Sequence, residues 1–166
     1  MTGSSLVPEV QRHLDDQIQS ARRLLGAILE QGKAIRKQDV EGVMARLADI
    51  KAEMDLRGRL ESERVTILTR AGAELGVEPA GVTLEGLMSL MSPADAEIAG
   101  ARSAELRGLL DEIAREHGVN RALMRQELAF LDHLMRLLGQ EGDSGYTPNG
   151  HGPSGQSPHH VLDLQA

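Results

Sequence analysis

Apolar residues recur every three or four positions along three long stretches of the chain, and this periodicity restricts the fold more than any other feature. The stretches cover residues 6–36, 40–75 and 93–138. A spacing of three and four places the apolar side chains on one face of an α-helix. Helices that each carry one apolar face must pack on one another, so the chain is predicted to be all-α.

Three predicted apolar seams determine the packing that we expect between these helices. Each seam consists mainly of aliphatic residues and methionine, and the third also contains a histidine and an asparagine. The first seam is Val10, Leu14, Ile18, Ala21, Leu25, Ile28 and Ile35, the second is Val40, Val43, Leu47, Ile50, Met54, Leu60, Ile67, Leu68, Ala71 and Leu75, and the third is Ile98, Leu106, Leu109, Ile113, His117, Asn120, Met124, Leu128, Leu131, Leu134 and Leu138.

The composition indicates the same class of fold. Aromatic residues make up 1% of the chain, against 40% for the wider hydrophobic set, so apolar burial must come from aliphatic side chains and methionine. This composition is typical of helix-on-helix packing rather than of a β-sandwich. The expected architecture is a long antiparallel helical hairpin or a three-helix, coiled-coil-like bundle, with a short extra helix over residues 84–91.

Capping signals define the ends of the predicted helices. Asp39 is expected to cap the start of the second long helix, and Gly76 is expected to end it. Thr83 is expected to cap the short helix. The strongest signal is the sequence "SPAD", in which Ser92 is the N-cap, a proline takes the first helical position and Asp95 faces the free N–H groups.

Glycines fall inside or at the edges of the helical stretches, where each costs about 0.5–1 kcal/mol relative to alanine. Two interpretations stay open at this point. Some of the glycines allow two helices to approach closely, or the bundle is loosened so that a partner can dock on it or rearrange it. The positions are Gly26, Gly32, Gly42, Gly58, Gly72, Gly86, Gly100, Gly108 and Gly118.

The end of the chain has a different character. Residues 142–155 read "GDSGYTPNGHGPSG", a composition that does not form a packed core. The chain is therefore predicted to divide into a helical domain, residues 1–139, and a disordered tail, residues 140–166. Tyr146 lies in this tail, although the whole chain has only one tyrosine and one phenylalanine.

Charge and hydropathy exclude several classes of protein. The net charge of −7 argues against a nucleic-acid-binding protein, which would usually carry a basic face. No run of 18 apolar residues is present to cross a membrane, and the first residues lack the basic and apolar regions of a secretory signal. The protein is expected to act in the cytoplasm, without membrane insertion.

Motifs that carry chemistry are missing. The six histidines do not form the Glu-x-x-His or His-Glu-x-x-His patterns of helical metal sites. The chain has no cysteine, no Gly-x-Ser-x-Gly and no phosphate-binding loop. We predict no enzyme activity, no cofactor and no metal, and we expect His117 on the third seam to be half-buried and hydrogen-bonded. A metal-binding helical bundle is the alternative that elemental analysis would test.

The stretch "LMRQELAFLDHLMRLL", residues 123–138, is apolar on more than one stripe of the helix. Such a wide face either buries more of the bundle core or forms the wall of a groove for an amphipathic helix of another protein. Its methionines suit a surface that adapts to its partner. Asn120 lies in the seam just before it, where it either fixes helix register or partner choice, or makes a simple hydrogen bond to a neighbouring helix.

Three segments carry a resemblance to a known family. They are "LLGAILEQGKAIRKQDVEGVMARLADIKAEM", the later "NRALMRQELAFLDHLMRLL" and the following "GYTPNGH". Together they resemble the FlgN-like flagellar export chaperones, which serve the hook-filament junction proteins, over roughly residues 10–151. The resemblance implies an all-helical cytoplasmic chaperone without ATPase activity. It would bind the C-terminal segment of a junction protein as a helix, prevent its premature assembly or degradation, and deliver it to the export gate.

The resemblance also implies roles for particular residues. Tyr146 matches the tail tyrosine that the family uses to dock on the cytoplasmic domain of the export gate. A competing hypothesis is a structural homo-oligomeric coiled-coil protein without a client, in which the wide apolar face closes the oligomer. If a client binds, its expected contacts are Asn120, Leu123, Met124, Glu127, Leu128, Phe130, Leu131, Leu134, Met135 and Leu138.

Overall fold

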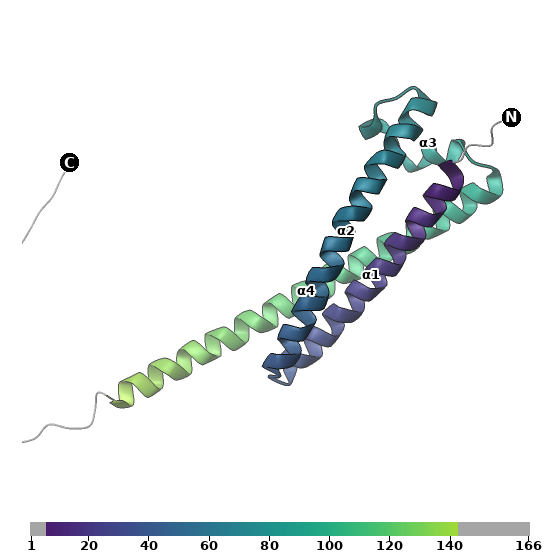
Figure 1. The fold of residues 1–166 in the computed structure, drawn as a ribbon. Helices are drawn as coiled ribbons and strands as arrows, with labels where there is room; N and C mark the ends of the chain where they lie inside the picture. Colours follow the sequence, from purple (N-terminus) through teal and green to yellow (C-terminus); the bar gives the residue numbers. More distant parts are fainter. Residues whose placement is uncertain (1–5, 143–166) are drawn as a thin grey trace, which may run out of the picture. The chain divides into compact units, whose positions relative to one another are not determined.

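A computed structural model describes residues 6–142, and within them every regular element is a helix (Figure 1). The prediction of an all-α chain built on three long helices is therefore confirmed. The elements are α1 (Leu6–Arg36), α2 (Val40–Leu75), the 3₁₀ turn η1 (Pro79–Gly81), α3 (Leu84–Ser89) and α4 (Pro93–Gly142).

The ends of α2 are capped as the sequence predicts. Asp39 has an extended backbone, and its carboxylate accepts a hydrogen bond from the Gly42 N–H at 2.9 Å. Gly76 adopts the left-handed conformation with φ 69°, and its N–H donates to the Gly72 carbonyl. A residue with a side chain is strained at that φ, so glycine here ends the helix without the strain that another residue would bring.

The caps of α3 and α4 are also confirmed. The Thr83 hydroxyl accepts from the Gly86 N–H at 3.0 Å. Ser92 Oγ accepts from the Asp95 N–H at 3.2 Å and donates to the Asp95 carboxylate at 2.7 Å. This reciprocal arrangement starts α4 at the proline that follows Ser92.

The chain divides into two compact units, Met1–Leu128 and Ala129–Ala166, and α4 contributes residues to both. Helix α4 ends at Gly142, so residues 140–142, which the sequence assigned to the tail, are helical. The remainder of the predicted tail, with Tyr146, lies outside the described residues.

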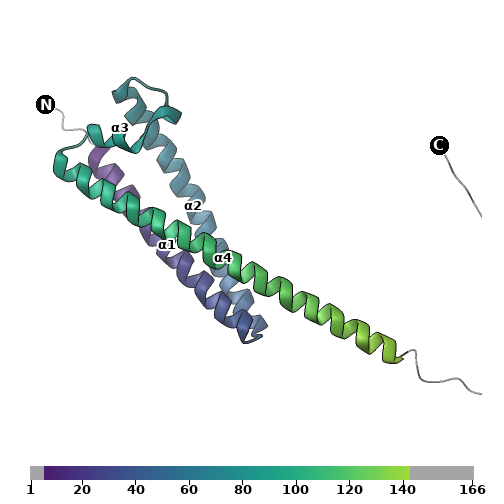
Figure 2. The ribbon, with the colours of Figure 1, turned by 180° about the vertical axis from the view of Figure 1, so that it is seen from behind.

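In the first unit, α2 runs antiparallel to α1, and α4 runs parallel to α1. Arg70 near the end of α2 pairs with Glu9 near the start of α1, and Arg23 pairs with Glu53 at 2.6 Å. Contacts to α4 include Gln11 to Asp95 at 2.9 Å and Asp15 to Arg102 at 2.7 Å from α1, and Gln38 to Glu127 at 3.4 Å from the turn after α1. Figure 2 shows the part of α4 that belongs to the first unit starting at the end of the hairpin where α3 lies and passing beside α1.

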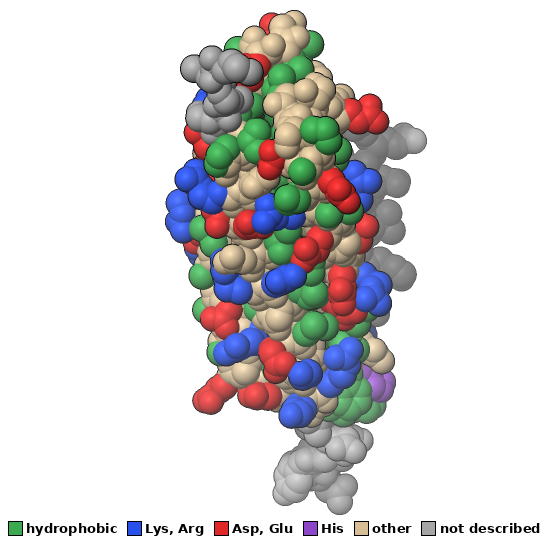
Figure 3. Space-filling model, turned by 90° about the vertical axis from the view of Figure 1, so that its right-hand side faces the viewer, with side chains coloured by type: hydrophobic (Ala, Val, Ile, Leu, Met, Phe, Trp, Pro, Cys, Tyr) green, Lys and Arg blue, Asp and Glu red, His purple; other side chains and the backbone are tan. Residues whose placement is uncertain are grey.

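The surface carries charges of both signs close together. Figure 3 shows one face on which Lys and Arg side chains are interspersed with Asp and Glu side chains, with hydrophobic side chains between them. Ion pairs such as Lys51 with Asp55, at 3.1 Å, lie within one helix. Exposed pairs of this kind contribute about 0–1 kcal/mol each, so they influence solubility more than stability.

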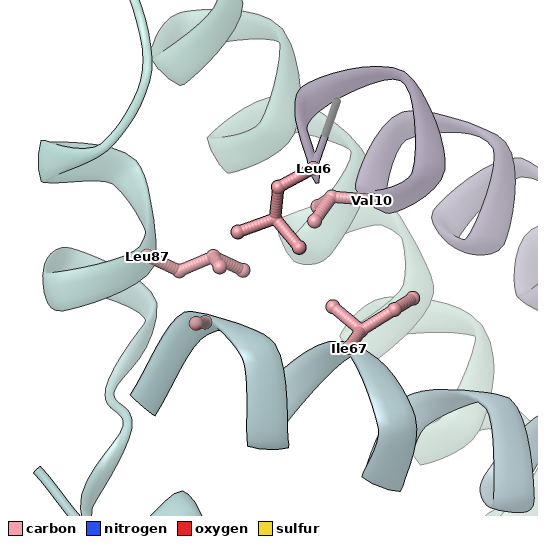
Figure 4. Close-up of a cluster of buried hydrophobic side chains, with 5 residues drawn as sticks. Leu6, Val10, Ile67 and Leu87 are labelled. Atoms are coloured by element: carbon pink, nitrogen blue, oxygen red, sulfur yellow. The ribbon is translucent and has the colours of Figure 1, made fainter. Parts of the chain in front are cut away.

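The core of the first unit lies where α1 begins and α2 ends. Leu6 and Val10 of α1, Ile67 and Ala71 of α2 and Leu87 of α3 form a cluster in which no side chain is more than 9% exposed. Figure 4 shows these side chains converging from the three helices. The short helix α3 therefore closes this end of the hairpin.

Helix α1 is buried far more completely than α2. Helix α2 has only four buried residues, Leu60, Ile67, Ala71 and Gly72, all in its second half. In the first half the predicted seam is wrong for Val40, Leu47 and Met54, which are 74%, 49% and 53% exposed, whereas Val43 and Ile50 are half-buried. The apolar residues of this half lie on two stripes of the helix, and α1 covers only one of them.

The predicted seam of α4 also needs correction. Ile98 is exposed, and its neighbour Ala99 is fully buried instead. His117 is exposed, so the prediction of a half-buried, hydrogen-bonded histidine is wrong. Asn120 faces α1, and a residue three positions earlier is offset by roughly 60° around the helix, which leaves His117 in solvent.

Candidate binding surfaces

The described part of the second unit presents a wide apolar face. Five large apolar side chains lie between residues 129 and 137, and all of them are exposed, from 36% for Leu134 to 73% for Met135. We call this set the distal apolar face. Its members are Phe130, Leu131, Leu134, Met135 and Leu137.

The spacing of these residues makes the helix strongly amphipathic. At 3.6 residues per turn they fill about half of its circumference. The other half carries Asp132 and Arg136, which form an ion pair one turn apart, and His133. A helix with an exposed apolar half and a solvated polar half is suited to pack against another apolar surface.

The remaining predicted client contacts fall into different environments. Leu123, Met124 and Glu127 are half-buried, and the Glu127 carboxylate accepts a hydrogen bond from Gln38 at 3.4 Å. Leu128, the last residue of the first unit, is 66% exposed. Leu138 lies in α4, but its side chain is outside the described part of the structure.

Asn120 has a role inside the first unit. Its side chain is 2% exposed, and Nδ2 donates to the Ile28 carbonyl of α1 at 2.7 Å and to Gln31 Oε1 at 3.4 Å. The interpretation of Asn120 as a simple hydrogen bond to a neighbouring helix is confirmed. Its predicted contact with a client has no support in this geometry, because the side chain is covered.

Gly32 explains how α1 and α4 come this close. A Cβ atom at Gly32 would lie 2.6 Å from Asn120 Oδ1. At this position the close-approach interpretation of the helical glycines is correct. At four other helical glycines no close approach is involved, because an added Cβ would meet nothing within 4 Å. These are Gly26, Gly58, Gly108 and Gly118.

The middle of the hairpin is also held by polar contacts. The buried Ser20 hydroxyl donates to Glu53 at 3.0 Å, and Arg23 donates to the same carboxylate at 2.6 Å. The hydrogen bond from Arg23, followed by that from Ser20, lowers the pKa of Glu53, although desolvation of the carboxylate acts in the opposite direction. Glu53 is therefore held ionised against α1.

A second exposed apolar surface lies on α2, which contributes no residue to the predicted client contacts. Val40, Met44, Leu47 and Met54 are all about half exposed or more, and we call this set the α2 outer stripe. These four residues follow one another at spacings of four, three and seven, which is a helical apolar pattern in the sequence. The predicted seam of α2 did not include Met44. Lys51 occupies the intervening heptad position and pairs with Asp55.

The described residues contain neither a candidate metal site nor a membrane-spanning helix. In residues 6–142, no group of three or more His, Asp or Glu side chains could hold a metal ion. No helix in this range is long and apolar enough to cross a membrane.

Comparison with known protein families identifies the family of the chain. The family model described as FlgN protein matches residues 1–156. The chain belongs to the FlgN family. FlgN proteins are flagellar export chaperones, a family of chaperones rather than of enzymes, and they bind flagellar export substrates. No curated protein and no solved structure matches the chain.

Proposed function

We propose that this FlgN protein is the cytoplasmic chaperone of the hook-filament junction proteins. It binds their C-terminal segment, prevents premature assembly or degradation, and delivers the client to the export gate. The observation that supports this proposal is the distal apolar face, which leaves half of the helix circumference free for a client.

The chemistry of the face fits a client that folds on binding. An amphipathic helix of the client would bury its apolar stripe against Leu131, Leu134 and Met135, which are all exposed. Ordering the client consumes part of the interaction free energy, so the affinity is moderate and the client can be released. No hydrolysis by the chaperone is needed for that release.

Titration of a labelled C-terminal segment of a junction protein tests the distal apolar face. We expect the double variant Leu131→Glu/Met135→Lys to weaken binding by about a hundredfold or more, because it places charges where apolar surface is buried. The two new residues are four apart and oppositely charged, so they support the helix. The matched control, Asp132→Lys/Arg136→Glu, reverses the ion pair on the polar half and should bind normally. Equal binding by both variants would contradict the proposed site.

We propose separately that Tyr146, outside the described residues, docks the chaperone on the export gate. An aromatic ring supplies buried area and its hydroxyl finds a polar partner. Tyr146→Ala should therefore abolish export while client affinity and thermal stability stay normal. A drop in stability instead would mean that the ring packs on the helical domain.

A homo-oligomer without a client is the second candidate, and the α2 outer stripe favours it. Its heptad spacing is that of a coiled-coil seam, interrupted by Lys51. Light scattering at micromolar concentration distinguishes the two candidates. A stable oligomer that Leu47→Glu dissociates, together with no client binding, would support the structural role over the chaperone of junction proteins.

A further inference from the structure

The exposed surface of α2 continues beyond the four residues of the α2 outer stripe. Gly58, Glu61 and Val65 keep the helical spacing of three and four after Met54, and all three are exposed. Leu68, the next position of this spacing, is half-buried. We call the following eight residues the extended α2 stripe. They are Met44, Leu47, Lys51, Met54, Gly58, Glu61, Val65 and Leu68.

This stripe lies on the side of α2 that the first unit leaves uncovered. Leu60 and Ile67, which are 4% and 8% exposed, each follow a stripe residue by two positions and so lie roughly 200° away around the helix. A Cβ atom added at Gly58 would meet nothing within 4 Å. At the next position after the stripe, a Cβ at Gly72 would lie 2.7 Å from the Val77 carbonyl oxygen. The turn that follows α2 therefore ends the open surface.

The extended α2 stripe matches itself when it is read in the opposite direction. Its eight residues form four pairs, and the two members of each pair are equally far along the chain from Leu56. Two antiparallel copies of α2, related by a two-fold axis at the level of Leu56, would bring each pair together twice. The pairs are Met44 with Leu68, Leu47 with Val65, Lys51 with Glu61, and Met54 with Gly58.

The members of each pair suit one another in size and polarity. In the two outer pairs, a large apolar side chain meets another large apolar side chain, and their burial favours association. In the central pair, Met54 meets Gly58, where the missing side chain leaves room for it. The remaining pair joins the opposite charges of Lys51 and Glu61, whose side chains are 76% and 55% exposed.

The charged pair decides the orientation of the two copies. In a parallel dimer, Lys51 would face Lys51 of the second copy and Glu61 would face Glu61, and like charges in a coiled-coil seam are destabilising. The antiparallel arrangement replaces both contacts with pairs of opposite charge. Lys51 and Glu61 also pair with Asp55 and Arg64 one turn away on their own helix. Exposed ion pairs of this kind are weak, so they do not prevent a contact with the second copy.

We propose that the protein forms an antiparallel dimer through the extended α2 stripe. The occupant is a second copy, because the match requires this same sequence in reverse. The stripe covers residues 44–68, more than three heptads, which is a typical length for a coiled-coil seam. It shares no residue with the distal apolar face, so the dimer remains able to bind a client. The inference is therefore independent of the proposed function and differs from an oligomer that has no client.

Charge reversal in the full chain tests the dimer through its mass, measured by sedimentation equilibrium from micromolar to millimolar concentration. Lys51→Glu and Glu61→Lys should each raise the dimer Kd by about tenfold or more, since each creates two pairs of like charge across the axis. Arg59→Glu, a reversal at an exposed arginine of α2 outside the stripe, should leave the Kd unchanged. A wild-type chain that stays monomeric, or charge variants that dimerise as the wild type does, would overturn the inference.

Mixing the two charge variants distinguishes a lost contact from a folding defect. In an equimolar mixture of Lys51→Glu and Glu61→Lys, each charged position meets an opposite charge on the other chain. A heterodimer about as stable as the wild-type dimer is therefore expected. If the mixture stays as monomeric as the separate variants, Lys51 and Glu61 do not face each other and the inference is wrong.

Disulfide cross-linking tests the register, since the chain has no cysteine of its own. A mixture of Leu47→Cys and Val65→Cys should form a covalent heterodimer under oxidising conditions. Either variant alone should not, because the two copies of one such residue would be eighteen positions apart along the axis, roughly 27 Å and too far for a disulfide. Cross-linking of Leu47→Cys with itself would indicate a parallel dimer and contradict the proposed register.

Two further results would assign the stripe to another occupant and so overturn the inference. A monomeric chain whose client affinity falls in Lys51→Glu would indicate that the client covers the stripe. A chain ending at residue 142 that dimerises, where the full chain does not, would indicate that residues 143–166 cover it. The proposed function fails separately, since Leu131→Glu/Met135→Lys should lose the client and keep the dimer.

Discussion

Helix α1 and the distal part of α4 differ in which side chains they bury and which they expose. Helix α1 buries His13, Gln17, Ser20 and Gln31, none of them more than 8% exposed. The distal apolar face leaves five large apolar side chains in solvent. Buried polar groups are usually rare and exposed apolar patches usually mark interaction sites. In α1, buried polar groups contact the neighbouring helices, whereas the distal apolar face exposes the apolar surface that we propose a client covers.

The largest test of this contrast compares one buried and one exposed apolar residue. Ile67→Ala removes a side chain from the core cluster and should lower the free energy of unfolding by about 2–5 kcal/mol. Leu131→Ala should change it by less than about 0.5 kcal/mol, because the residue is exposed. Urea denaturation of the full chain measures both. A similar loss in both variants would mean that Leu131 packs within the protein and is not free for a partner.

A smaller effect is expected where α4 meets α1. Gly32→Ala forces Asn120 from its position and should cost about 1–3 kcal/mol. Gly26→Ala on the same helix meets open space and should stabilise by about 0.5–1 kcal/mol.

The pairing with Asn120 is tested by a double-mutant cycle. In an Asn120→Ala background, Gly32→Ala should cost less, because the clashing oxygen is absent. Additive effects, or a loss of stability in Gly26→Ala, would show that Gly32 is required for another reason than its contact with Asn120.

The smallest effect concerns the polar contact between α1 and α2. The pKa of Glu53 is lowered in the folded protein, so its contribution is present above the unfolded pKa and is lost as the pH falls through the folded value. Glu53→Gln should reduce the unfolding free energy at neutral pH by about 1 kcal/mol or less. The unfolding free energies of the variant and the wild type should converge as the pH falls below about 5. Arg23→Met should reproduce this pH dependence, since Arg23 is the largest cause of the shift. A constant difference down to pH 3 would contradict this assignment.

The helix boundaries could be predicted because they depend on local chemistry. Asp39, Gly76, Thr83 and Ser92 each satisfy backbone groups within four residues of themselves. The sequence around each position therefore contains all the information that places the cap. The end of α4 was less well predicted, since Gly139 did not stop the helix.

Which apolar side chains are buried could not be predicted in the same way. Burial depends on which side of each helix the neighbouring helix covers. Val40 and Leu47 belong to a valid apolar pattern, but α1 covers another side of α2. The Asn120 hydrogen bond is a similar case. Its acceptor is the backbone carbonyl of Ile28, 92 residues earlier, and a carbonyl leaves no mark in the sequence. Tyr146 and the client contacts remain predictions.

The parallel course of α1 and α4 has a consequence for the order of folding. The polar contacts of the α1–α2 hairpin join residues 30 to 61 positions apart, whereas those between α1 and α4 join residues 83 to 92 positions apart. Contacts between more distant residues form later, since a longer loop must close first. The hairpin is therefore expected to form early on the ribosome, and α4 to join it only after nearly the whole chain has been synthesised.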